Sequence, residues 1–114
     1  MKNIVSAAAV AGLFLAVSTS ATAETQWQKD HPRRAEVNSR IGNERAKTNN
    51  AAANGKLTGA QAHQLNKEDH QIRKEERSMA AQNGGHLTKQ EQHKLNRQEN
   101  AVNAQRRADI RSNQ

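Results

Sequence analysis

Large apolar residues are sparse beyond position 30, and their spacing is helical. In three segments they recur four or seven residues apart: Val37 and Ile41; Leu65, Ile72 and Met79; Leu95 and Val102. Side chains three, four or seven residues apart share one helix face. The pattern predicts helices over residues 32–52, 59–82 and 89–111, each with about half of the apolar seam that a coiled coil uses.

A repeat with a period of 30 residues marks where these helices begin and end. Residues 54–67 match residues 84–97, with Gly, Leu, Thr, His, Leu and Asn at equivalent positions. In each copy a Leu precedes a Thr, and Gln or Glu follows the Thr three residues later, which is a capping-box pattern. The preceding glycines favour the left-handed conformation that ends a helix. The expected cap residues are Gly55, Leu57, Thr58, Gln61, Gly85, Leu87, Thr88 and Glu91.

These boundaries predict an all-α fold of three helices joined by short Gly-containing turns. The helical repeat domain spans residues 32–112, with repeat units at about 54–82 and 84–112, and residues 24–31 are expected to form a flexible arm. Pairs such as Glu36–Arg40 and Asp69–Arg73 stand one turn apart and are expected on an exposed face. Because the apolar core is thin, we expect loose packing that self-association or a partner completes.

Residues 1–23 have the pattern of a secretory signal. Lys2 precedes an apolar run from Ile4 to Val17, and Ala21-Thr22-Ala23 is a small-x-small cleavage site. The alternative is a membrane anchor, but the run is shorter than the roughly 20 apolar residues that span a bilayer. A bacterial lipoprotein is excluded, because the chain has no cysteine. We therefore expect a soluble periplasmic or secreted protein without a transmembrane span.

The signal segment also accounts for much of the apolar composition. It contains 15 of the 38 apolar residues, which leaves 23 for the other 91 positions, 12 of them alanine. Lys2 is its one charged residue, so residues 24–114 keep 17 basic and 11 acidic residues and a net charge of +6. This composition excludes a large enzyme with a deep apolar pocket and a disulfide-stabilised scaffold.

The basic residues form clusters that would attract polyanions, with a strong dependence on salt. The candidate polyanion-binding residues are Arg33, Arg34, Arg73, Lys74, Arg77, Arg106, Arg107 and Arg111. Single-strand binders usually add aromatic stacking platforms, and residues 24–114 contain Trp27 alone. Sequence-specific nucleic-acid recognition is therefore not expected. The alternative is that these residues, interspersed with acids, form ordinary solvated helix faces.

Five histidines suggest a divalent transition metal such as Mn, Zn or Cu as a cofactor. The candidate ligands are His63, His70, His86 and His93. A site on one helix needs ligands three or four residues apart, and no two His, Asp or Glu residues have that spacing. A metal site must therefore be assembled between helices or between molecules. The alternative is that these histidines are solvated and bind nothing.

The chain has no pattern typical of a catalyst. It has no cysteine or tyrosine, no Gly-x-Ser-x-Gly elbow, no phosphate-binding loop and no carboxylate pair at helical spacing. We expect a protein that is not an enzyme.

The Leu-Thr-x-x-Gln of Leu57–Gln61 and the Leu-Thr-x-x-Glu of Leu87–Glu91 resemble the signature of the Spy- and CpxP-like periplasmic proteins. That resemblance implies an exported, basic, all-helical protein that holds unfolded clients or responds to envelope and metal stress. The chain also resembles small exported bacterial proteins with helix–NGxLT–helix repeats, which implies the architecture and no activity.

Three functions remain open. The first is a binding protein for a protein or envelope partner, with a chaperone-like action. The second is divalent-metal binding or scavenging, and the third is polyanion binding through basic helix faces.

Overall fold

The computed structural model describes residues 24–114, and the predicted signal segment lies outside the described residues. All regular structure in the described part is α-helix: α2 (Gln26–Asp30), α3 (Pro32–Ala53), α4 (Gly59–Gln82) and α5 (Lys89–Ser112). The all-α prediction is confirmed there, and the three long helices match the predicted ranges to within one residue at each end. None of the described helices combines the length and apolarity that crossing a membrane requires.

The prediction of three helices was wrong, because α2 lies within the segment expected to be a flexible arm. Thr25 caps α2 with the same motif as the longer helices. Its Oγ1 atom accepts from the Gln28 backbone N–H at 3.1 Å, and the Gln28 side chain accepts from the Thr25 N–H at 2.8 Å. A capping box thus starts a helix of five residues before Pro32 opens the next one.

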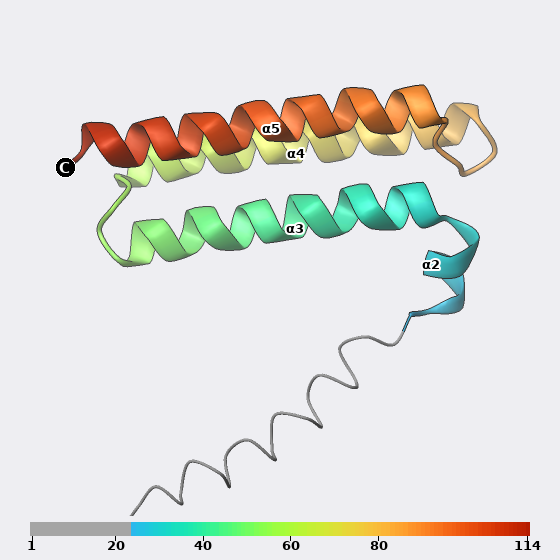
Figure 1. The fold of residues 1–114 in the computed structure, drawn as a ribbon, viewed down its shortest axis with the longest axis horizontal. Helices are drawn as coiled ribbons and strands as arrows, with labels where there is room; N and C mark the ends of the chain where they lie inside the picture. The colour runs from blue at the N-terminus through green and yellow to red at the C-terminus, as the bar shows by residue number, and fades with distance from the viewer. Residues whose placement is uncertain (1–23) are drawn as a thin grey trace, which may run out of the picture.

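The three long helices lie side by side in an up–down–up arrangement (Figure 1). Each of them packs against the other two, and α2 packs against the N-terminal end of α3. The antiparallel α4 and α5 place the two copies of the repeat next to one another. The result is a three-helix bundle.

Both turns between the long helices use the capping residues that the repeat predicts. The Thr58 and Thr88 hydroxyls accept from the backbone N–H groups of Gln61 and Glu91, at 3.0 and 3.1 Å. The glycines that precede them have positive φ: Gly55 (77°), Gly84 (66°) and Gly85 (92°). Leu57 and Leu87 are buried under the turns. In each turn, glycine ends one helix, a buried leucine anchors the turn, and threonine starts the next helix within a few residues.

The buried positions alternate three and four residues apart along α3 and α5, and along α4 as far as Glu76, as in a coiled coil. The apolar core consists of Val37, Ile41, Ala51, Leu57, Leu65, Ile72, Ala80, Leu87, Leu95 and Val102. Polar side chains occupy the remaining seam positions: Glu44, Thr48, Asp69, Glu76, Glu99 and Arg106. The apolar stripe was predicted to be half empty, and its other half holds polar groups.

The expected surface ion pairs are not among the ion pairs of residues 24–114. Asp69 is fully buried and does not lie on an exposed face. Glu36 accepts from Gln92 at 2.9 Å instead of pairing with Arg40. Glu36 and Asp69 both contact residues of α5, so contacts between helices replace the expected pairs along one helix.

Candidate functional site

The interior of the bundle contains more acidic than basic residues, and the surface contains more basic than acidic ones. Four of the eleven acidic residues of the described chain are buried: Glu44, Asp69, Glu76 and Glu99. Arg106 is the one fully buried basic residue among seventeen. Seven acidic and sixteen basic residues therefore lie outside the core. The surface is more positive than the net charge of +6 indicates, which raises its attraction for anions.

Part of this excess is arranged along the outer face of α4. His63, Lys67, His70, Lys74 and Arg77 alternate four and three residues apart, and all five are exposed. We call these five residues the cationic row. At 1.5 Å per residue the row runs for about 21 Å. Its exposure and spacing place it opposite the buried seam of α4.

The cationic row has no acidic neighbour one turn away. Residues three and four positions from each member are basic, histidine or uncharged. Glu68 and Glu75 are sequence neighbours of Lys67 and Lys74, but adjacent residues of a helix do not face each other. Like charges one turn apart destabilise a helix by a few tenths of a kcal/mol per pair. Lys74 and Arg77 are such a pair, so this part of the row imposes a cost on α4 that an ordinary mixed surface avoids.

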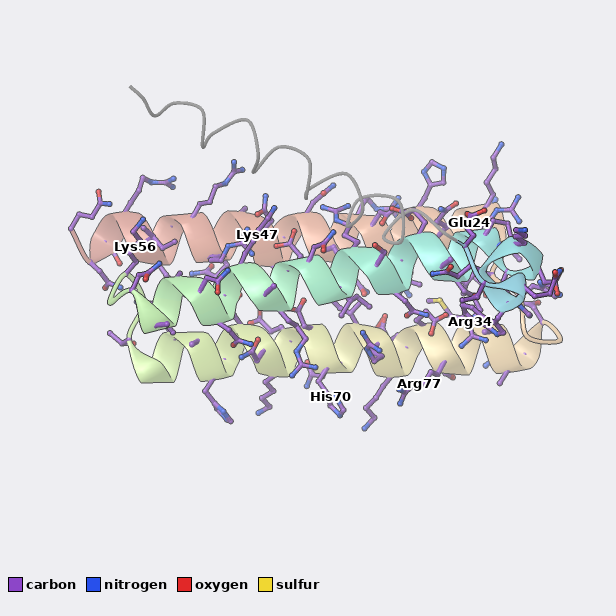
Figure 2. The ribbon with its side chains drawn as sticks, turned by 90° about the horizontal axis from the view of Figure 1, so that it is seen from below. Glu24, Arg34, Lys47, Lys56, His70 and Arg77 are labelled. Atoms are coloured by element: carbon purple, nitrogen blue, oxygen red, sulfur yellow. The ribbon has the colours of Figure 1, made fainter. Side chains whose placement is uncertain are left out.

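Figure 2 shows the labelled His70 and Arg77 side chains projecting from α4, away from the other helices. The equivalent face of α5 is weaker. It keeps His93, Arg97 and Arg107, but Asn100 and Ala104 stand where α4 has His70 and Lys74. The repeat thus contains one continuous cationic face and one interrupted face.

The predicted polyanion-binding residues are divided between surface and interior. Arg33, Lys74, Arg77, Arg107 and Arg111 are exposed, and Arg73 is half-buried. Arg34 pairs with Glu76, and Arg106 pairs with Glu44. Buried carboxylates thus hold the guanidinium groups of these two arginines, and their part in polyanion binding stays a prediction.

Sequence reasoning missed three members of the cationic row, namely His63, Lys67 and His70. Lys67 was not assigned to the basic clusters, and both histidines were considered only as metal ligands. Their alternating spacing of four and three residues was the signal that would have united them with Lys74 and Arg77.

The predicted metal ligands do not converge. His63, His70 and His93 are exposed on the outer faces of α4 and α5, and His86 lies in the turn between these helices. Within residues 24–114 no three His, Asp or Glu side chains lie close enough together to hold a metal ion.

His86 belongs instead to a stack of rings at one end of the bundle. The His31 ring lies between those of Trp27 and His86, with both centroid distances at 4.7 Å. The Arg34 guanidinium lies 5.2 Å from the Trp27 ring centroid, within range of a cation–π contact. The stack connects α2 to the turn between α4 and α5, so Trp27 helps to close this end of the bundle.

Buried polar groups link all three long helices. Arg106 of α5 donates to Glu44 of α3 and also to Asn103. Nearby, Asp69 of α4 and Glu99 of α5 interact through their side chains, and both are fully buried. Burial and the neighbouring charge of Asp69 together raise the pKa of the Glu99 carboxyl to about 8. Burial also raises the pKa of Asp69 to about 6.

Comparison with known proteins adds no further identification. No family model, no curated protein and no solved structure matches this sequence.

Proposed function

We propose that this chain is a small, exported, non-enzymatic protein that binds anionic polymers along the cationic row of α4. The observation that carries the proposal is the row itself: five exposed Lys, Arg and His side chains without an acidic neighbour one turn away. Export rests on the signal pattern of residues 1–23.

Electrostatics supports the row as a binding face. A polymer with repeated anionic groups meets several cationic side chains at once over about 21 Å of helix. Each contact releases a counterion from the polymer, so affinity falls steeply with added salt. Binding of this kind tracks the backbone of the polymer and needs no sequence readout.

The described surface offers less support for a chaperone-like action on apolar clients. Trp27 is the one large apolar side chain exposed in residues 24–114, at 40%. Its ring stacks on His31, so part of its surface is already used. A binding face for unfolded chains normally presents a contiguous apolar patch.

The proposal is tested by fluorescence anisotropy with a labelled heparin oligosaccharide at several salt concentrations. The binding variant is Lys67→Glu with Arg77→Glu in the row. The matched control is Arg97→Glu with Arg107→Glu, which changes the equivalent positions of the other repeat by the same charge. We expect salt-sensitive binding that the row variant weakens at least tenfold more than the control.

Two results would contradict this account. Absence of salt-sensitive binding by the unaltered protein would reject polyanion binding altogether. Equal losses in both variants would mean that net charge, rather than the row, governs the affinity.

A further inference from the structure

Asp69 and Glu99 present a charge problem in the middle of the bundle. Both side chains have 0% exposure, and none of their four carboxylate oxygens has a donor within hydrogen-bonding distance. A buried carboxylate without a donor is unfavourable, and two that face each other are more so. The two groups can nevertheless form a hydrogen bond if one of them carries a proton.

The surrounding groups do not supply a substitute for that proton. From α3, Glu44 adds a third negative charge, while the charge of Arg45 lowers the pKa of Asp69 and the charge of Arg40 lowers that of Glu99. From α5, the buried Arg106 also acts on Asp69, but its guanidinium donates to Glu44 and Asn103. Arg40 is held by Asn96 and Asn100. The buried layer therefore contains three carboxyl groups and one guanidinium.

We propose that the core of this bundle is a proton-binding site, in which Glu99 donates one proton to the Asp69 carboxylate and thereby holds α4 against α5. Loss of the proton to solvent leaves two facing carboxylates without a donor and loosens this helix pair. The inference is independent of polyanion binding, because it concerns only buried groups.

The direction of the pH dependence follows from the raised pKa values. A carboxyl whose pKa is higher in the folded than in the unfolded chain stabilises the fold fully below its unfolded pKa, near 4. That stability is lost as pH rises through the folded values, from about 6 for Asp69 to about 8 for Glu99. Between these values the folded chain holds about one proton more than the unfolded chain. The unfolding constant should then rise about tenfold per pH unit.

Urea unfolding of the purified protein at pH 5, 7 and 9 tests this site, with Glu99→Gln as the variant. The Gln amide has nearly the shape of the protonated Glu side chain and donates to Asp69 at every pH. We expect the midpoint of the unaltered protein to fall strongly from pH 5 to pH 9 and that of Glu99→Gln to fall much less. Glu75→Gln, an exposed acid of α4, should follow the unaltered protein.

Infrared spectroscopy supplies a second readout, which would show no protonated carboxyl if Glu99 only filled space in the core. At pH 7 the unaltered protein should show the C=O stretch of one protonated carboxylic acid, and Glu99→Gln should lack it. Parallel pH profiles for the two proteins, or no protonated carboxyl at pH 7, would overturn the proposal. If Glu99→Gln does not fold, Asp69→Asn and the infrared spectrum of the unaltered protein still decide the question.

Discussion

Arg106 of α5 forms an ion pair with Glu44 of α3 inside the bundle, where each side chain keeps only 6% of its surface exposed. Its counterpart near the other end joins Arg34 of α3 to Glu76 of α4. Both pairs lie at seam positions where a simpler bundle would have apolar residues. The three helices are therefore held together by apolar and polar contacts, and the partner of each charge helps to specify which helix faces it.

Removing one member of the buried pair should be costly. Arg106→Gln leaves Glu44 buried without its cation, so we expect a loss of about 3–5 kcal/mol in the free energy of unfolding, measured with urea. Arg107→Gln is the matched control, since Arg107 is the exposed neighbour, and its effect should stay within about 0.5 kcal/mol. Similar effects for the two variants would show that the pair does not stabilise the core.

The capping boxes of α4 and α5 should contribute equally to the stability of the bundle. Thr58 and Thr88 have nearly identical backbone angles, and both hydroxyls accept from the third residue of their helix. We expect Thr58→Ala and Thr88→Ala each to lower the free energy of unfolding by about 1 kcal/mol, and the double variant by about the sum. Thermal unfolding followed by circular dichroism measures all three. A negligible effect of either substitution would mean that its cap is dispensable.

Two glycines should respond in opposite directions to the same substitution. Gly42 lies inside α3 with open space around it, so Gly42→Ala should stabilise the bundle by about 0.5–1 kcal/mol. Gly55 has a φ of 77°, which an alanine adopts only with strain, so Gly55→Ala should destabilise it by about 1 kcal/mol. Urea midpoints of the two variants check the signs. A gain at Gly55 would contradict its role as a helix stop.

Local signals in the sequence predicted the helices well. Thr58 and Thr88 fix where α4 and α5 start, because a capping box depends only on residues within one turn. The same signal was present at Thr25 and Gln28, and it predicts α2 once it is applied to a short segment before Pro32. Gly55 and Gly85 were predicted as helix stops for a similarly local reason.

The interior was harder to predict, because charged residues were assigned to the surface by default. Asp69 continues the seam four residues after Leu65, and Glu99 does the same after Leu95, so their spacing indicated burial while their chemistry argued against it. Only contacts between helices decide the conflict: Arg106 meets Glu44 across 62 residues of sequence. The cationic row was missed for a related reason. The excess of positive charge on the surface becomes clear only when several acids are known to lie in the core.

Binding of anionic polymers along the outer face of α4 should be visible in the amide chemical shifts of the protein. Nuclear magnetic resonance spectra of the isotopically labelled protein are recorded while a heparin oligosaccharide is added at low salt. If the polymer binds along this face, the shift changes should be concentrated between His63 and Arg77, be smaller on α5 and reverse on addition of salt. Changes spread evenly over the three long helices, or none at all, would contradict it.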